Sequence, residues 1–133
     1  MLGELIGEGK GKRTARRVVA IEPVFKVEVS FEDASTLSGV LGMNIGTYTS
    51  VPKPDGSLHG IGEGVFATMD GETLTWRGIG TGAFQEGGAV RYVGCLSFTT
   101  ASTKLAHLNK VAGVFEFNVD GAGNTQTKTW EWK

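Results

Sequence analysis

The sequence predicts one all-β domain, residues 1–133, that closes as an eight-stranded antiparallel up-and-down barrel. The first indication is a pair of glycine runs spaced by two residues, Gly60–Gly64 and Gly78–Gly82, in consecutive strand-like segments. Because side chains alternate across a strand, each run lies on one face of its strand. The second indication is that eight strand-like segments follow one another through short turns in 133 residues. Eight strands close around an interior that side chains fill or that holds one small ligand.

The clearest strand covers Phe25–Phe31, where apolar and polar residues alternate as in a strand with one face in a core and the other in water. A long, glycine-interrupted strand precedes it over residues 5–21 and is separated from it by the Glu22-Pro23 step. A third strand is expected over residues 37–51. Its expected inner face carries Leu37, Leu41, Met43 and Ile45. The remaining strands are expected at residues 57–69, 73–84, 89–100, 111–119 and 125–133.

The hairpin that joins the two glycine runs has a predicted register. A three-residue loop of Asp70-Gly71-Glu72 would set Phe66 opposite Trp76 and Gly64 opposite Gly78. A two-residue loop would instead turn the two glycine runs to opposite faces, so the three-residue loop is preferred.

The next hairpin turns at Glu86-Gly87-Gly88 and predicts a second register. It sets Phe84 opposite Val90, Gly82 opposite Tyr92, and Trp76 opposite Phe98. An aromatic ring that covers a glycine on the neighbouring strand is a known device for stabilising sheets. Between this hairpin and the last one, a single short helix is expected at Ser102–Asn109, with Ser102 as its N-cap and Leu105 and Leu108 on one side.

Glycine inside a strand costs about 0.5–1 kcal/mol relative to alanine, so the six glycines of the two runs need a compensating role. One explanation is that they let the strands coil and make room for aromatic rings that fill the interior. The other is that they leave a hollow beside those rings for an apolar ligand. The candidate lining residues in either case are Phe66, Trp76, Phe84, Tyr92 and Phe98. The Tyr92 hydroxyl would need a partner inside the barrel and could orient a ligand.

The last hairpin leaves two registers open for the closing tryptophans. A five-residue loop, Asp120–Asn124, pairs Glu116 with Lys128 and turns Trp130 and Trp132 outward, where they would mark a contact between subunits. A register shifted by one residue would turn both rings inward.

Charge and composition exclude several classes of function. The net charge is −1, so the chain lacks the positive field of a generic nucleic-acid-binding protein. The basic cluster between Lys10 and Arg17 has no interleaved aromatic residues for base stacking and is interpreted as a solvated strand face. His59 and His107 have no nearby partner for a metal site, and no cofactor motif is found. No secretory or membrane segment is recognised, and with the lone Cys95 this favours a cytoplasmic protein.

Several turn, glycine and aromatic segments recur over most of the chain: Gly46-Thr47-Tyr48-Thr49, Pro54-Asp55-Gly56-Ser57, Gly60–Gly64, Trp76, Gly78–Gly82, Ala112-Gly113-Val114-Phe115-Glu116 and the closing tryptophans. In these segments the chain resembles a small uncharacterised bacterial and archaeal family with an allene-oxide-cyclase-like β-barrel of the calycin type. The resemblance implies a closed eight-stranded antiparallel barrel that is frequently oligomeric. The functional residues of the plant cyclase have no position-by-position counterparts here, so its reaction is not carried over.

These observations favour a binding protein that holds a small apolar ligand in a β-barrel and forms a homo-oligomer. The first alternative is a cofactor-free cyclase or isomerase that folds a small hydrophobic substrate into a reactive conformer. The second is a structural oligomeric module with a filled interior. Whether the chain is an enzyme is left open by the sequence.

Overall fold

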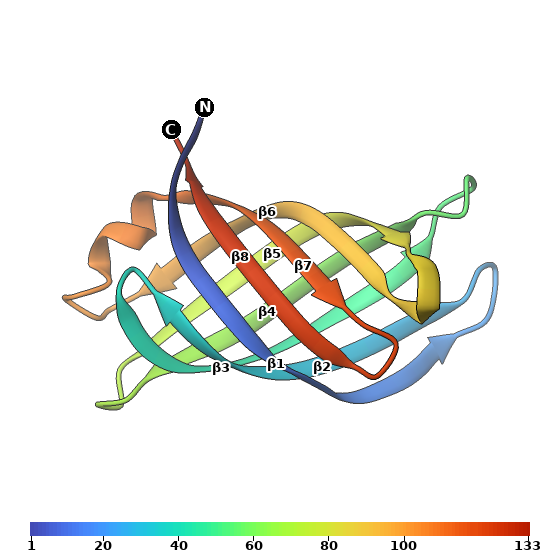
Figure 1. Cartoon of the computed structure of the whole chain (residues 1–133), viewed down its shortest axis with the longest axis horizontal. Coiled ribbons are helices and arrows are strands. Elements are labelled where there is room, and N and C mark those ends of the chain that lie inside the picture. Colours follow the sequence, from blue (N-terminus) through green and yellow to red (C-terminus); the bar gives the residue numbers. More distant parts are fainter.

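The computed structural model describes all 133 residues and shows a closed barrel of eight antiparallel strands, as predicted (Figure 1). Each strand pairs with the next one along the chain, and β1 pairs with β8 to close the sheet. Closure leaves no strand edge unpaired. The strands are β1 (Leu2–Ala20), β2 (Lys26–Leu37), β3 (Val40–Pro52), β4 (Leu58–Thr68), β5 (Thr73–Phe84), β6 (Val90–Thr100), β7 (Ala112–Val119) and β8 (Asn124–Trp132).

Two of the three predicted registers are confirmed. Strands β5 and β6 pair Gly82 with Tyr92 and Trp76 with Phe98. Strands β7 and β8 pair Glu116 with Lys128, so the outward register of the tryptophans is the one observed.

The register predicted between β4 and β5 is wrong, because the three-residue loop begins one residue earlier than predicted. Gly64 lies opposite Trp76 and Phe66 lies opposite Leu74, because the three-residue loop is Met69-Asp70-Gly71. Gly71 has a φ of +87°, and a three-residue hairpin loop needs this left-handed conformation at its last position. The loop length was correct, so both glycine runs still face the interior.

Of the four residues predicted on the inner face of the third strand, only Leu37 is buried, and it belongs to β2. Leu41, Met43 and Ile45 are 57%, 50% and 56% exposed, and the alternate positions of β3 face inward instead. Two of these inward positions are glycines that leave room for rings: a Cβ on Gly42 would lie 2.6 Å from the Phe66 ring. A Cβ on Gly46 would lie 2.7 Å from the Phe31 and Trp76 rings.

One end of the barrel is closed by a short helix. The helix is shorter than predicted, a 3-10 helix η2 (Ala106–Lys110), and Ser102 does not cap it. Leu105 and Leu108 are completely buried and pack with the end cluster formed by Leu37, Phe66, Leu74 and Phe98. A second 3-10 helix, η1 (Glu86–Gly88), lies in the β5–β6 connection. Both 3-10 helices are far too short to span a membrane.

A second group of buried residues fills the barrel toward its other end. This aromatic cluster consists of Phe31, Leu58, Tyr92, Phe117 and Val119, with Tyr48 packed against it. The rings of Phe31 and Phe117 lie 4.8 Å apart, and those of Tyr48 and Tyr92 lie 5.4 Å apart. The interior between the end cluster and the aromatic cluster is where the candidate site lies.

Candidate functional site

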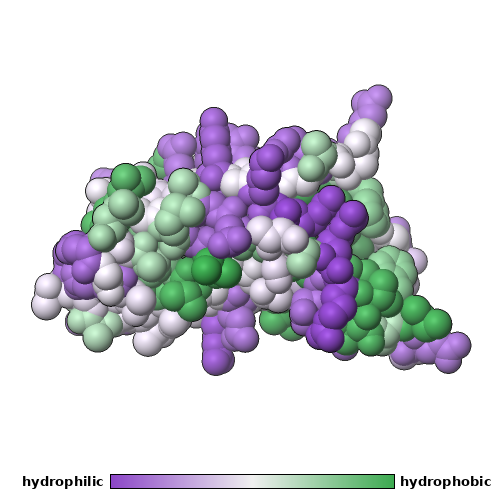
Figure 2. Space-filling view, turned by 90° about the horizontal axis from the view of Figure 1, so that it is seen from below, coloured by the Kyte–Doolittle hydropathy of each residue, from purple (hydrophilic) through white to green (hydrophobic).

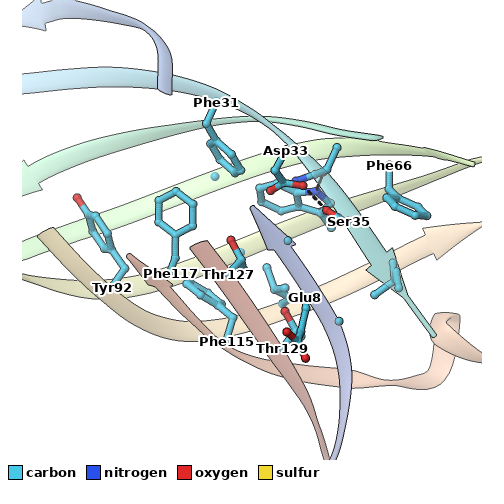
Figure 3. Close-up of a pocket in the computed structure, with 18 of the residues that line it drawn as sticks. Glu8, Phe31, Asp33, Ser35, Phe66, Tyr92, Phe115, Phe117, Thr127 and Thr129 are labelled. Atoms are coloured by element: carbon cyan, nitrogen blue, oxygen red, sulfur yellow. Dashed lines mark hydrogen bonds between the residues drawn. The ribbon is translucent and has the colours of Figure 1, made fainter. Parts of the chain in front are cut away.

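A cavity of about 120 Å³ lies inside the barrel between the two buried clusters (Figure 3). Three glycine runs form much of its wall, including Gly7 and Gly9 of β1, Gly60 and Gly62 of β4, and Gly78 and Gly80 of β5. Gly64 makes room for the Trp76 ring, as the first explanation expects, while Gly60 and Gly78 of the two runs line the cavity. The aromatic and aliphatic lining residues are Phe31, Leu37, Tyr48, Phe66, Trp76, Tyr92, Leu96, Phe98, Phe115 and Phe117.

The structure places four of the five candidate residues, Phe66, Trp76, Tyr92 and Phe98, along this cavity. The expectation for Phe84 is wrong, because its side chain is 61% exposed. Phe84 is the last residue of β5 and shares the inward register of the glycine run, but it lies where the strand leaves the barrel for the β5–β6 connection.

A polar cluster on strands β2 and β3 interrupts the apolar lining. Its centre is Asp33, whose side chain is only 3% exposed. The Ser35 hydroxyl donates a hydrogen bond to one Asp33 carboxyl oxygen, and Asn44 Nδ2 donates to the other at 3.4 Å. Figure 3 shows Asp33 and Ser35 between the aromatic side chains Phe31 and Phe66. The otherwise apolar cavity therefore has one buried carboxyl group in its wall, that of Asp33, and one exposed carboxyl group, that of Glu8 of β1 (Figure 3).

The orientation of the Asn44 amide is determined by Trp76. The indole Nε1–H, which can only donate, donates to Asn44 Oδ1 at 2.8 Å. The amide NH₂ group must therefore point toward Asp33. A chain of hydrogen bonds from β5 through β3 to β2 holds the carboxyl group in place.

The carboxyl group of Asp33 has no cationic neighbour. No lysine, arginine or histidine side chain lines the cavity or forms an ion pair with it. Burial raises the pKa of Asp33, and the hydrogen bonds from Ser35 and Asn44 oppose this rise. Desolvation is the larger effect, so ionisation of Asp33 costs folding free energy.

The space for Asp33 is made by glycines on β1. Gly9 pairs with Ser35 and Gly11 pairs with Asp33. A Cβ on Gly9 would lie 2.8 Å from Ser35 Oγ and 3.0 Å from an Asp33 carboxyl oxygen. The run Gly7, Gly9 and Gly11 therefore lets these two polar side chains fold over β1.

Two threonines of β8 lie on the other side of this glycine run. Gly9 pairs with Thr127 and Gly11 with Thr125, so each threonine is one strand further round the barrel from Ser35 and Asp33. Their hydroxyl oxygens are buried and have no hydrogen-bond partner. Thr127 lines the cavity. Buried hydroxyl groups normally have partners, so the wall near Asp33 has unused hydrogen-bonding capacity.

The aromatic cluster supplies the opposite part of the lining. The Tyr92 hydroxyl, which was expected to need a partner, bonds to Ser50 Oγ at 2.7 Å. Burial raises the pKa of both Tyr92 and Tyr48. Both phenols are therefore neutral over the physiological pH range, and Asp33 is the only cavity-lining carboxyl group that is buried.

The remaining candidate residues lie elsewhere. His107 bonds to Ser38 Oγ at 2.7 Å and attaches η2 to the β2–β3 turn. Trp132 is 55% exposed and Trp130 is half-buried on the outer face.

Sequence reasoning missed Asp33, although a signal was present. The alternation predicted over Phe25–Phe31 continues along β2 in the same register to Leu37. Extending it places Asp33 and Ser35 on the inner face with Phe31.

Asp33→Asn is expected to stabilise the ligand-free protein at neutral pH. A carboxyl group whose pKa is higher in the folded state than in the unfolded state binds more protons when folded, so stability falls as pH rises between the two values. The asparagine has no charge to desolvate and can keep both contacts, accepting from Asn44 and donating to Ser35 Oγ. Thermal melts across pH should show the gain at neutral pH and its disappearance below the ordinary Asp pKa of 3.8. A variant that is less stable than wild type at neutral pH would contradict this.

Comparison with known proteins finds similarity in structure only. No protein-family model and no curated protein matches the sequence. A conserved protein of unknown function from Rhodopseudomonas palustris superposes with a TM-score of 0.82 at 12% identity, over 98% of this chain and 97% of that one. A β-barrel-like protein from Acinetobacter baumannii superposes with a TM-score of 0.83 at 11% identity, over 100% of this chain and 96% of that one. An enzyme from Penicillium herquei superposes with a TM-score of 0.68 at 16% identity, over 96% of this chain and 92% of that one. At these identities the likeness shows a shared barrel fold.

Proposed function

We propose that this protein binds a small apolar molecule inside its barrel. The observation that carries the proposal is the cavity of about 120 Å³ between two packed clusters, walled by aromatic rings and glycine backbone. Cores normally pack without voids of this size. An apolar cavity of about 150 Å³ in another protein stays dry and binds benzene, so this one suits a ligand of about one ring. Burial of the ligand's apolar surface would supply the affinity.

Filling the cavity with a larger side chain is expected to weaken ligand binding. Toluene titrated into the wild-type protein should bind and shift the NMR signals of cavity-lining residues. Leu96→Trp places a larger side chain in the same space and should weaken toluene binding by about tenfold or more, which is about 1.4 kcal/mol. The matched control is Cys95→Trp, the same new side chain on the outer face of the same strand, which should leave toluene binding unchanged. No binding of toluene by the wild-type protein, or equal binding by both variants, contradicts the proposal.

A cofactor-free cyclase or isomerase, in an allene-oxide-cyclase-like barrel, is the second candidate. Two observations favour it: a buried carboxyl group in an apolar cavity is a suitable general acid or base, and one similar barrel is an enzyme from Penicillium herquei. In this function the cavity would hold a flexible substrate in a reactive conformer while Asp33 moves a proton. Asp33-dependent exchange of the α-protons of cyclohexanone into heavy water, followed by NMR, would separate catalysis from binding alone.

We also propose that copies of the chain associate through the outer face around Trp132. Leu2 pairs with Trp132 and Leu5 with Trp130, and Leu2, Leu5 and Trp132 are all exposed. On the side of the barrel away from the chain ends, apolar patches are separated by polar side chains (Figure 2). Aromatic residues are enriched in subunit contacts, above all at the centre of the contact.

The molar mass by light scattering should exceed that of one 14.1 kDa chain, and Trp132→Lys should reduce it to the monomer value. Ile61→Lys, on the outer face of β4, is the matched control and should leave the mass unchanged. A monomeric wild-type protein, or dissociation by Ile61→Lys alone, would count against the Trp132 face.

A further inference from the structure

If the barrel binds a small apolar molecule as proposed, the polar cluster around Asp33 restricts the chemical class of that ligand. An ionised carboxylate has about four acceptor sites on its two oxygens. Asp33 receives only two hydrogen bonds, from Ser35 and Asn44. It therefore keeps free acceptor capacity inside the barrel.

The neighbours of Asp33 are arranged around an acceptor. Because Trp76 occupies the amide oxygen of Asn44, only N–H groups of Asn44 face the carboxyl group. The Ser35 hydroxyl donates to it as well. This arrangement matches the carboxylate form, whose negative charge has no positive partner among the residues that line the cavity. The complementary ligand group is a cation that donates hydrogen bonds.

The unpartnered threonines provide a second, independent observation. The hydroxyl oxygens of Thr125 and Thr127 are buried and make no hydrogen bond, and Thr125 is only 4% exposed. Both lie across the β1 glycines from Asp33 and Ser35. An ammonium group has three N–H donors and no acceptor. It can donate to the Asp33 carboxylate and to Thr127 together, whereas a carboxylate or carbonyl group on the ligand would meet a negative charge.

Aromatic rings near Asp33 also suit a ligand that carries both a cation and an apolar ring. The Phe31 and Trp76 ring centroids lie 6.3 Å apart, and both rings pack over Gly46 of β3. Phe31 is two residues before Asp33 on the same face of β2, and Trp76 is joined to Asp33 through Asn44. The faces of aromatic rings attract cations, and they also pack against an apolar ring.

We propose that the barrel binds small primary amines that carry one apolar ring, with the ammonium group on the Asp33 carboxylate and Thr127 and the ring among the aromatic side chains. The cavity of about 120 Å³ sets the upper size at about one ring with a short arm. Benzylamine has this composition and is the probe for the test. Toluene and benzyl alcohol have nearly the same shape without the charge, and benzoate has the opposite charge.

Calorimetric titrations at neutral pH and low salt would compare the four probes on the wild-type protein and on Asp33→Asn. The wild-type protein should bind benzylamine about tenfold or more tightly than toluene or benzyl alcohol, and should not bind benzoate. Asp33→Asn should lose the preference for benzylamine over toluene. Thr127→Val removes one acceptor but no charge, and should reduce that preference by a smaller factor. It also provides the test if Asp33→Asn does not fold.

The outcomes separate the two proposals. If the wild-type protein binds none of the four probes, the proposed function fails and this inference fails with it. If it binds toluene but binds benzylamine no more tightly than benzyl alcohol, or prefers benzoate, the amine assignment is overturned and the proposed function stands. A benzylamine preference that persists in both variants would also overturn the assignment, because the ammonium site would then lie elsewhere.

Discussion

Gly64→Ala is expected to destabilise the protein by about 3 kcal/mol or more, at or beyond the upper end of ordinary overpacking effects. A Cβ at this position would overlap the Trp76 indole ring and lie 2.6 Å from the carbonyl oxygen of Ile45. Neither neighbour can easily move away. The indole is held by its hydrogen bond to Asn44, and the carbonyl belongs to the paired strand β3. Thermal or urea unfolding followed by tryptophan fluorescence would measure the loss.

The matched control is Gly7→Ala, another inward-facing glycine of the barrel wall. Its Cβ would lie 3.2 Å from the flexible end of Leu37 and 3.6 Å from the next nearest atoms, so a small side-chain movement makes room. Alanine is also favoured over glycine inside a strand by about 0.5–1 kcal/mol. We expect a change in stability within about 1 kcal/mol of wild type. Equal losses in the two variants would show that steric overlap at Trp76 is not the reason for Gly64.

Turn chemistry explains which registers could be predicted. At Glu86–Gly88 and at Asp120–Asn124 the loop residues bound the strands clearly, and the pairings that follow are correct. At the β4–β5 turn the loop length was correct but its position was not. The Thr68 hydroxyl bonds to Asp70 and accepts from the backbone of Glu72, which ends the strand pair at Thr68. These contacts depend on side-chain geometry that the sequence does not display.

The direction of β3 could not be predicted because its large aliphatic residues lie on the face that turns outward. Leu41, Met43 and Ile45 are the larger hydrophobic side chains, yet they face outward. The interior opposite β3 is occupied by rings from other strands, so the inward positions there are small or polar, such as Gly42 and Asn44. Strand periodicity gives the two faces but not their direction when partners distant in sequence have taken the space.

Only part of the candidate site could be predicted from the sequence. The aromatic and glycine lining follows from alternation within the central strands, whereas the polar cluster depends on side chains from β2, β3 and β5 meeting at one place. Asp33 is a single carboxyl group in a strand and matches no motif. Its significance comes from burial without a cation, which only the closed barrel brings about.

Leu108→Ala is expected to reduce the free energy of unfolding by about 2–5 kcal/mol, the range for truncating a fully buried leucine. Leu108 is completely buried and belongs to the cluster that closes one end of the barrel, where it packs with Phe66 and Phe98. Both phenylalanines also line the cavity, so the truncation extends the hollow interior toward this end. Urea unfolding would measure the loss, and a larger probe such as propylbenzene should gain affinity relative to toluene.

Lys110→Ala is the matched control, since Lys110 is exposed at the end of the same helix η2 and should change stability by less than about 0.5 kcal/mol. A loss below about 1 kcal/mol for Leu108→Ala would mean that η2 is detached from the barrel in solution. The cavity would then be open at this end, and toluene would dissociate faster than from a barrel that Leu105 and Leu108 close. If the variant instead loses stability as expected and propylbenzene gains affinity, the helix is both a structural closure and the wall that limits ligand length.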